Sequence, residues 1–377
     1  MNQTSPFTPT FGSSPSVPVG RADIVESFTL ALRSGPGSPS RALLLSGTRG
    51  VGKTVLLNEV EDAAREQGWA VITETALPGL VNRLVNEHLP ALLQMVDPRS
   101  TVRRVTGVTG PAGLGGFTGT VHERHPIVPG LRTQLTQALN HLQEHHVGLL
   151  ITVDEIGRGT TAELAELAAA VQHIFRENRD IALALAGLPD EVNALLKHRG
   201  ITFIRRADHR ELGAVTREEA RRGLVEPVEE NGWHWDETAL NRALEATRGY
   251  PFMIQLIGHH SWLAAKNPTV IDDQAVEHGT QRALKDLNTL VLKPLVAELS
   301  GLDLAFVKAM AEDPGPSKVS DIAARIDRSA DTVAQYRRRL IARHIVVPVS
   351  HGVVAFTIPG LREFLHIEED HAPIPFW

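Results

Sequence analysis

The sequence predicts an α/β fold in which a parallel sheet lies between two layers of helices, followed by two smaller helical modules. Up to about residue 210, apolar runs typical of buried strands alternate with helical periodicity, and this alternation predicts a parallel sheet with right-handed crossovers. From Glu211 the apolar pattern is helical only. We therefore expect a flexible tail at 1–18, a core at 19–210, a helical lid at 211–299, a C-terminal module at 300–368 and a second tail at 369–377.

Length and composition exclude several classes of protein. At 377 residues the chain is long enough for two or three domains, and its lack of cysteine excludes disulfides and thiolate metal sites. The net charge of -6 argues against attraction of the whole protein to nucleic acid or to an acidic membrane. No apolar run approaches ~20 residues, and the N-terminus lacks a signal-like pattern. We expect a cytoplasmic protein without membrane segments.

A glycine-rich turn between an apolar strand and a helix provides the strongest motif. The turn follows the phosphate-binding pattern G-x-x-x-x-G-K-[ST], and the strand before it and the helix after it supply the context that the motif requires. Inward backbone N–H groups and the positive end of the helix dipole suit a triphosphate. We expect Lys53 to face the β- and γ-phosphates of ATP and Thr54 to ligate Mg²⁺. The residues of this P-loop are Gly47, Thr48, Arg49, Gly50, Val51, Gly52, Lys53 and Thr54.

A second apolar run, residues 148–153, ends in Asp154 and Glu155. A buried parallel strand would place both acids at the carboxyl edge of the sheet, beside the P-loop. We expect Asp154 to hold Mg²⁺ and Glu155 to orient and deprotonate the attacking water. The alternative is that the two acids are solvated and cap the next helix, and the P-loop earlier in the chain argues against it.

The other stretches of the predicted core carry weaker sequence signals of function. The glycine-rich stretch 96–129 follows no regular pattern, and we expect a mobile insertion there. Residues 200–204 are predicted to form the last short strand, directly before Arg205 and Arg206. A guanidinium at that edge could stabilise charge on a γ-phosphate, in its own subunit or in a neighbouring one. The alternative, that both arginines only hydrate the strand end, agrees with the sequence equally well.

The helical lid contains one unusual turn. Helices are expected to begin after Thr216 and near Asp236, Pro251 and Asp272. The run Gly249-Tyr250-Pro251 separates two of these helices and could press against a nucleotide, which makes Tyr250 and Pro251 candidate binding residues. A simpler interpretation is that Gly249 ends one helix and Pro251 begins the next.

The C-terminal module is predicted to be a winged helix-turn-helix. Helices are expected from about 302, at 319–326 and at 330–342, followed by a hairpin of residues 345–349 and 353–358. Residues 318–343 contain seven Lys/Arg and three Asp, a local net charge of +4. Winged helices bind DNA or dock proteins, and the basic charge favours double-stranded DNA. The candidate DNA contacts on the third helix are Thr332, Gln335, Arg338 and Arg339.

With Val19-Gly20-Arg21, the P-loop, Asp154-Glu155, a lid and a terminal winged helix in this order, the chain resembles the AAA+/STAND group of P-loop ATPases. It is similar to archaeal-type ATPases and to origin-recognition-like AAA ATPases, over about residues 19–366. The resemblance implies an α/β P-loop NTPase sandwich and an ATP-dependent switch that controls a DNA-binding winged helix. It also carries the phosphate, metal and catalytic roles onto Lys53, Thr54, Asp154 and Glu155.

Two departures from the family pattern imply slow ATP hydrolysis. The fourth strand ends in Ala186-Gly187, where many AAA+ members place a polar sensor, and the lid has a glycine-x-proline turn without the arginine sensor of the initiators. That turn is more like the STAND lid. The alternative function is therefore a STAND-like signalling scaffold whose winged helix binds protein, and a homo-oligomer or a protein partner is compatible with either function.

Overall fold

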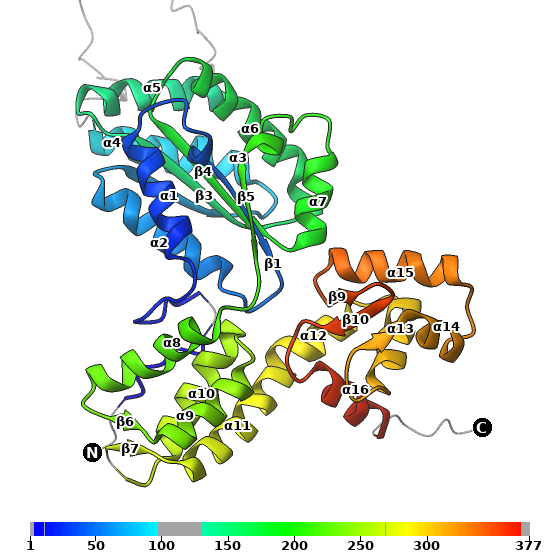
Figure 1. Cartoon of the computed structure of the whole chain (residues 1–377). Helices are drawn as coiled ribbons and strands as arrows, with labels where there is room; N and C mark the ends of the chain where they lie inside the picture. The colour runs from blue at the N-terminus through cyan, green and yellow to red at the C-terminus, as the bar shows by residue number, and fades with distance from the viewer. Residues whose placement is uncertain (1–3, 11, 97–129, 268, 371–377) are drawn as a thin grey trace, which may run out of the picture.

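The computed structural model describes residues 4–10, 12–96, 130–267 and 269–370. Nearly all of the insertion expected at 96–129, and most of the tail expected at 369–377, lie outside these ranges. Figure 1 shows an α/β domain, a helical lid below it, and a C-terminal module beside both. Within the described ranges, no helix has the length and apolarity needed to cross a bilayer.

A five-stranded parallel sheet forms the centre of the α/β domain, as predicted. Its order is β2-β3-β4-β1-β5, and every neighbouring pair is parallel. Strands β1 and β4 are buried along their whole length, which explains their continuous apolar runs. The strands are β1 (Ala42–Gly47), β2 (Ala70–Thr75), β3 (Leu149–Ile156), β4 (Ile181–Gly187) and β5 (Asp208–Leu212).

Helices cover both faces of this sheet (Figure 1). Alternate residues of β1 enter different cores: Leu43 and Leu45 pack with one layer, and Leu44 packs with the other. The first layer contains α1 (Ala22–Arg33) and α2 (Lys53–Glu66). The second layer contains α3 (Leu80–Arg83), a π-helical turn (Leu84–His88), α4 (Leu89–Val96), α5 (Leu131–Glu144), α6 (Thr161–Arg176) and α7 (Pro189–Lys197).

The last strand is not where the sequence pattern placed it. The apolar residues Ile201 and Ile204 are buried by packing against the second layer, without pairing to a strand, and Ile204–Arg206 is a 3₁₀ turn. The fifth strand is β5, whose polar sequence suits an edge strand that pairs with β1 alone. Because β5 runs parallel to β1, Arg205 and Arg206 precede it at the amino edge of the sheet, opposite the P-loop.

The lid contains four helices: α8 (Arg217–Glu230), α9 (Glu237–Thr247), α10 (Pro251–Ala264) and α11 (Asp273–Leu287). They begin where the sequence predicts: capping side chains fix the first turns of α8, α9 and α11, and α10 has proline at its first position. Thr216 forms a reciprocal capping box with Glu219, and Asp236 and Asp272 each accept backbone N–H groups of the following helix. Two short strands, β6 (His234–Trp235) and β7 (Val270–Ile271), pair at the far end of the lid.

A π-helical turn (Asn288–Leu292) and α12 (Lys293–Ala297) lead from the lid into the C-terminal module. There Ser329 caps the third helix by accepting a hydrogen bond from the Thr332 N–H group, as its sequence suggested. Antiparallel strands in the order β8-β10-β9 complete the module. Its elements are α13 (Gly301–Ala311), β8 (Ser317–Lys318), α14 (Val319–Arg325), α15 (Ala330–Ala342), β9 (Val346–Ser350), β10 (Val353–Phe356) and α16 (Leu361–Asp370).

The N-terminal segment is packed against the lid, so the prediction of a flexible tail is wrong for its described residues. Phe7 is only 3% exposed, and its ring occupies the space that a side chain at Gly258 of α10 would need. The Thr8 N–H group donates to Gln255 Oε1 at 3.1 Å, and Val17 is also buried. We call residues 4–10 and 12–19 the strap. Its Ser/Pro-rich sequence is ordered by these few anchors.

Candidate nucleotide site

Three glycines allow the P-loop to adopt its shape. Gly52 has a left-handed φ of 91° at the start of α2, a conformation that few other residues adopt. A Cβ at Gly47 would lie 2.7 Å from Val51 and 2.8 Å from the Leu212 carbonyl oxygen. A Cβ at Gly50 would lie 2.7 Å from the hydroxyl of Tyr250. The loop is therefore closely packed by β5 and by the lid.

The predicted phosphate-binding cation, Lys53, lies inside this loop. Its Nζ donates to the carbonyl oxygens of Gly47 at 2.9 Å and Thr48 at 2.8 Å. Burial lowers the pKa of Lys53 to about 8, and the nearby Asp154 carboxylate partly opposes that effect. A poorly solvated ammonium held only by carbonyl groups has charge available for an anion.

The two predicted metal ligands meet at the carboxyl edge of the sheet. The Thr54 hydroxyl donates to Asp154 Oδ2 at 2.5 Å, although a hundred positions separate the two residues. Both groups are hard oxygen ligands of the kind that Mg²⁺ prefers, so the residues present fit this cation. The described residues include no cluster of three or more His, Cys, Asp or Glu arranged to hold a metal.

A bulge near the end of β3 sets the position of Glu155. Pairing with β4 is interrupted between Val153 and Ile156, and Glu155 has a φ of 55°, unusual for a residue other than glycine. Its backbone N–H group donates to Asp154 Oδ1 at 2.7 Å, and its side chain is exposed. The next strand offers no polar group here, because a side chain at Gly187 would clash with Ile156.

The Gly249-Tyr250-Pro251 turn touches the P-loop itself. The Tyr250 hydroxyl donates to the Arg49 carbonyl oxygen, and the Phe252 N–H group donates to Gly50 O at 3.2 Å. Tyr250 is 2% exposed, and burial raises the pKa of its hydroxyl well above the usual value, so it stays a donor. Gly249 has a φ of 68° and lies so close to the Val215 carbonyl oxygen that a side chain would clash.

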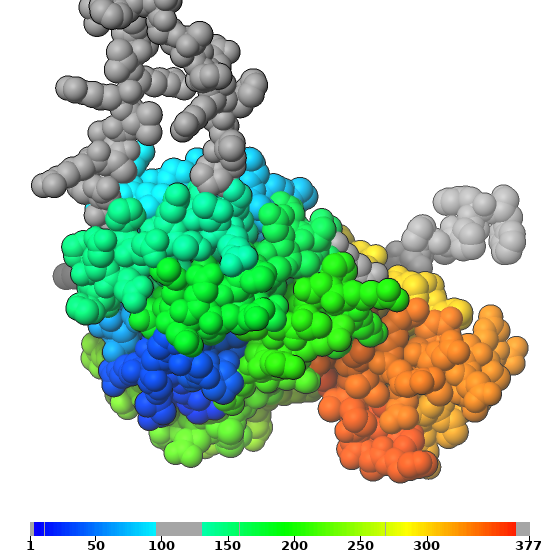
Figure 2. Space-filling view, turned by 90° about the horizontal axis from the view of Figure 1, so that it is seen from above, coloured from blue at the N-terminus to red at the C-terminus, as the bar shows by residue number. Residues whose placement is uncertain are grey.

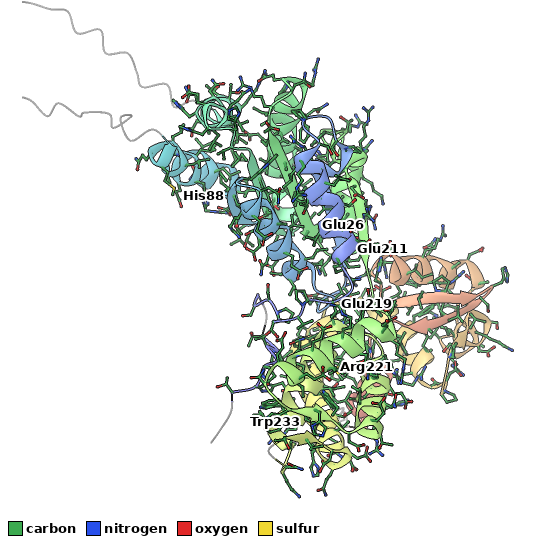
Figure 3. The ribbon with its side chains drawn as sticks, turned by 60° about the vertical axis from the view of Figure 1, so that its left-hand side comes forward. Glu26, His88, Glu211, Glu219, Arg221 and Trp233 are labelled. Atoms are coloured by element: carbon green, nitrogen blue, oxygen red, sulfur yellow. The ribbon has the colours of Figure 1, made fainter. Side chains whose placement is uncertain are left out.

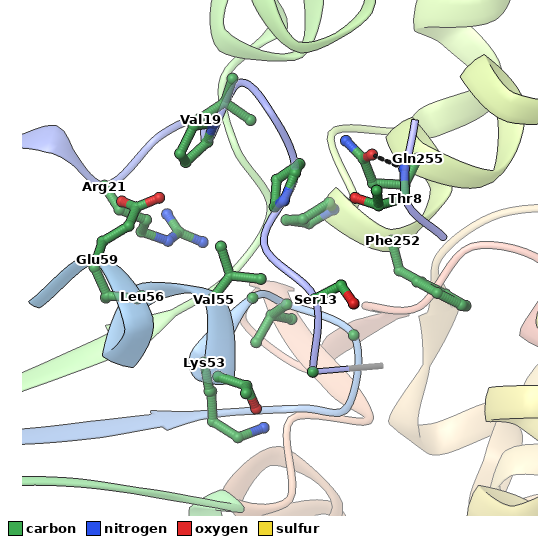
Figure 4. Close-up of a pocket in the computed structure, with 18 of the residues that line it drawn as sticks. Thr8, Ser13, Val19, Arg21, Lys53, Val55, Leu56, Glu59, Phe252 and Gln255 are labelled. Carbon is green, nitrogen blue, oxygen red and sulfur yellow. Dashed lines mark hydrogen bonds between the residues drawn. The ribbon is translucent and has the colours of Figure 1, made fainter. Parts of the chain in front are cut away.

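A cavity of about 140 Å³ opens beside the P-loop, between the strap, α2 and α10. Helix α2 supplies Lys53, Val55 and Glu59, and the strap and lid supply Thr8 and Gln255, which are joined by a hydrogen bond (Figure 4). Pro251 also lines it. An apolar cavity continuous with a phosphate loop has the right place for a nucleotide base.

The sequence analysis missed the strap and Glu59 as parts of this site. Glu59 Oε1 is buried and has no hydrogen-bond partner among the described residues. Burial raises the pKa of Glu59 to about 7, and Asp62 adds to that effect. One signal was available: Glu59 lies four residues after Val55, on the same face of the helix that begins at the P-loop.

The structure does not bring Arg205 or Arg206 to the P-loop of the same chain. They lie at the opposite edge of the sheet, and the Arg205 guanidinium donates to the carbonyl oxygens of Leu196 at 2.6 Å and His198 at 3.3 Å. The interpretation that they stabilise a γ-phosphate in their own subunit is therefore wrong. Their action on a neighbouring subunit stays a prediction.

The four candidate DNA contacts on α15 differ in their surroundings. Arg339 forms an ion pair with Asp303 at 2.6 Å, donates to Ser300 Oγ at 2.9 Å, and lies over the ring of Tyr336. Because Asp303 is 2% exposed, this arginine neutralises a buried carboxylate. Of the other three candidates, Thr332, Gln335 and Arg338, only Arg338 is charged; it forms no ion pair with a described residue, and its Nε donates to the Ala334 carbonyl oxygen at 3.3 Å.

Residues 17–183 match the model of the AAA ATPase domain family. Residues 290–365 match a family described as a domain of unknown function, DUF8462. No curated protein matches the chain significantly.

Two solved structures are similar to the chain over almost their whole length. The Walker-type ATPase PABY2304 of Pyrococcus abyssi is 16% identical with a TM-score of 0.61, over 97% of this chain and 99% of that chain. The ORC2 protein of Aeropyrum pernix, in ADPNP-ADP complexes, is 13% identical with a TM-score of 0.62, over 96% of this chain and 98% of that chain. At such identities the likeness shows the fold.

Proposed function

We propose that this protein, with its AAA ATPase domain, is an ATP-dependent switch whose C-terminal winged helix binds double-stranded DNA. The observation that carries the proposal is the contact between Thr54 and Asp154, which joins the P-loop to the carboxyl end of β3 next to the charge of Lys53. Bound Mg²⁺ would neutralise phosphate charge at this place. The contact of the lid turn with the P-loop gives the nucleotide a route to the rest of the chain.

In this proposal each residue of the site has a separate role. Lys53 exchanges its carbonyl partners for phosphate oxygens, and Thr54 and Asp154 hold the cation. Glu155 accepts a proton from the attacking water at the edge of the sheet. Tyr250 and Pro251 hold the lid against the loop, and the cavity that ends at Glu59 receives the base.

Hydrolysis is proposed to be slow. Ile156 fills the space beside Gly187, so β4 offers no polar side chain to the developing charge, and the lid turn contains no arginine. Glu155→Gln should retain ATP and lose turnover. Turnover should rise with protein concentration if Arg205 or Arg206 acts on a neighbouring subunit, because an arginine supplied in trans contributes on the order of a thousandfold. Rapid, concentration-independent turnover that survives replacing both arginines would contradict these proposals.

We propose that the exposed face of α15 contacts the DNA. Arg338 and Gln335 lie on that helix in a segment with a net charge of +4. Arg339 is left out of the test because its replacement would leave buried Asp303 unpaired and disturb folding.

The experiment measures fluorescence anisotropy of a duplex at several salt concentrations, with and without ATP. Wild type should bind more weakly as salt rises, and Arg338→Ala combined with Gln335→Ala should lose affinity. Arg222→Ala, a surface arginine of the lid, is the charge-matched control.

A second function, docking of a protein partner in a STAND-like scaffold, is favoured by the hairpin. Val347 and Val349 on β9 are 42% and 55% exposed, and exposed apolar side chains suit a protein surface better than a phosphate backbone. If the protein shows no salt-dependent affinity for duplex DNA, this alternative replaces the first. A Val347→Asp variant should then lose its partner, whereas Arg338→Ala should retain it.

A further inference from the structure

The α/β domain meets the C-terminal module at a group of charged side chains next to the P-loop. Seen from above, the module (orange) abuts the α/β domain along one side (Figure 2). Glu211, in β5, lies at this junction (Figure 3). We call the group the junction cluster, and its members are Arg49, Asp190, Glu211, Glu298, Arg343 and His344.

Two polar contacts of normal length hold the junction. Arg49 of the P-loop pairs with Glu298, at the end of α12, at 2.8 Å. His344, just after α15, contacts Glu211 Oε1 through Nε2 at 2.9 Å. The side chains of Arg49 and Glu298 are 38% and 43% exposed, so a change of charge nearby can separate them at a small cost in free energy.

Arg343 is held more loosely. Its guanidinium lies 3.8 Å from Glu298 and 3.9 Å from Asp190, beyond hydrogen-bond distance, and its side chain is only 16% exposed. The described part of the chain offers no hydrogen-bond acceptor to this guanidinium. A poorly hydrated arginine with unused N–H donors is suited to bind a phosphate group.

The position of Arg343 connects it to the nucleotide site. A small cavity is lined by Thr48 and Arg49 of the P-loop, by Leu188 and Pro189 after β4, and by Arg343. Thr48 is also the residue whose carbonyl oxygen accepts from Lys53 Nζ. The C-terminal module therefore places a cation at the carboxyl edge of the sheet, where β4 itself offers no polar side chain.

We propose that Arg343 binds the terminal phosphate of ATP and that Glu298 is its counter-charge when no nucleotide is bound. The inference rests on the proposed nucleotide site and adds a residue from the C-terminal module to it. A triphosphate competes with Glu298 for Arg49 and Arg343, so the ion pair of Arg49 with Glu298 is broken while Arg343 links the C-terminal module to the nucleotide. ATP and ADP are thereby distinguished, because only ATP carries the phosphate that reaches Arg343.

The test measures the affinities of the full chain for a non-hydrolysable ATP analogue and for ADP by calorimetry. Arg343→Ala should lower affinity for the analogue by about tenfold and leave ADP almost unchanged, the loss expected for one charge-assisted contact. Glu298→Gln should raise affinity for the analogue severalfold, since it removes the competing charge. Arg328→Ala, an exposed arginine of the same module with the same loss of charge, should leave the ratio of the two affinities unchanged.

A second measurement does not depend on affinity. Hydrogen exchange of backbone amides in 343–346 should decrease when the analogue binds to wild type, because the phosphate ties Arg343 to the P-loop, and should not decrease in Arg343→Ala. An Arg343→Ala protein that loses both nucleotides equally, or neither, overturns the inference. If Lys53→Ala abolishes binding while Arg343→Ala leaves the ratio unchanged, the nucleotide site stands and only the role of Arg343 fails. Wild type that binds neither nucleotide would refute the proposed function as well.

Discussion

The P-loop is contacted from two sides, and the two sets of contacts are of different kinds. On the lid side, buried Tyr250 donates to the Arg49 carbonyl oxygen and the Phe252 N–H group donates to Gly50 O. On the side of the C-terminal module, the half-exposed side chains of Arg49 and Glu298 form an ion pair. Buried hydrogen bonds to the backbone are little affected by salt, whereas an exposed ion pair contributes about 0.2–1 kcal/mol and is screened. We call the lid side of the P-loop the fixed side, because its contacts should persist in salt. We call the side of the C-terminal module the detachable side, because its ion pair should weaken.

The strap extends the fixed side. Phe7 packs at Gly258 and Thr8 bonds to Gln255, both in α10 of the lid, while the Asn58 side chain of α2 donates to Ser14 Oγ at 3.0 Å. The strap thus joins the lid to the helix that follows the P-loop. Opening the fixed side would break apolar packing as well as hydrogen bonds, and opening the other side would break the ion pair of Arg49 with Glu298.

The largest expected effect comes from removing the charge that lies between the two sides. Lys53→Ala should lower ATP affinity by at least about 100-fold, because it removes the buried ammonium that faces the β- and γ-phosphates in the proposed site. Calorimetry with ATP measures the change, and Lys285→Ala in the lid is the control for loss of a lysine. A folded Lys53→Ala protein with unchanged ATP affinity would refute the P-loop assignment.

The second prediction breaks the fixed side at its turn. Gly249→Ala should destabilise the protein by about 2 kcal/mol, since alanine disfavours the positive φ and its Cβ would clash with the Val215 carbonyl oxygen. The displaced turn should also weaken ATP binding. Gly232→Ala is a matched control: its φ is 75°, but a Cβ there would meet nothing within 4 Å. Urea unfolding of both variants measures the difference, and equal losses would show that the clash is relieved without cost.

These two sides differ in how far the sequence could predict them. The P-loop, the paired acids and the lid turn are local patterns, because the strand, the turn and the cap that form them are neighbours in the chain. The partners of Glu298 and Arg343 come from distant segments and carry no local signal. The Ser/Pro-rich composition of residues 1–18 predicts a flexible tail, whereas the burial of Phe7 depends on a groove that the folded lid creates.

The error at the fifth strand has a related cause. Ile201 and Ile204 have the apolar side chains of a buried strand, but they pack on the second helical layer as a turn. The true edge strand, β5, has the sequence Asp-His-Arg-Glu-Leu, and no pattern of hydrophobicity marks it. Pairing with β1 determines its conformation, and pairing between distant segments is not visible in local periodicity.

The third prediction concerns Glu59 on the fixed side, whose pKa is raised by burial from 4.5 to about 7. The folded protein binds a proton here more tightly than the unfolded chain, so this group favours folding at low pH and that contribution is lost as pH rises from about 4.5 to 7. Glu59→Gln should remove this part of the pH dependence of the melting temperature. Glu66→Gln, an exposed carboxyl of the same helix, should retain it. Identical pH profiles for wild type and Glu59→Gln would contradict the burial of this carboxyl.

The smallest expected effect tests the comparison directly. A double-mutant cycle of Arg49→Ala and Glu298→Ala should give a coupling free energy of about 0.2–1 kcal/mol at low salt, measured by thermal unfolding. At about 1 M salt the screening length falls to roughly 3 Å, and this coupling should almost disappear. Tyr250→Phe removes only the hydroxyl that reaches the Arg49 carbonyl oxygen on the lid side, and its cost of about 1 kcal/mol should be the same at both salt concentrations. A salt-insensitive coupling between Arg49 and Glu298, or a salt-sensitive loss in Tyr250→Phe, would mean that the two sides of the P-loop are held by the same kind of interaction.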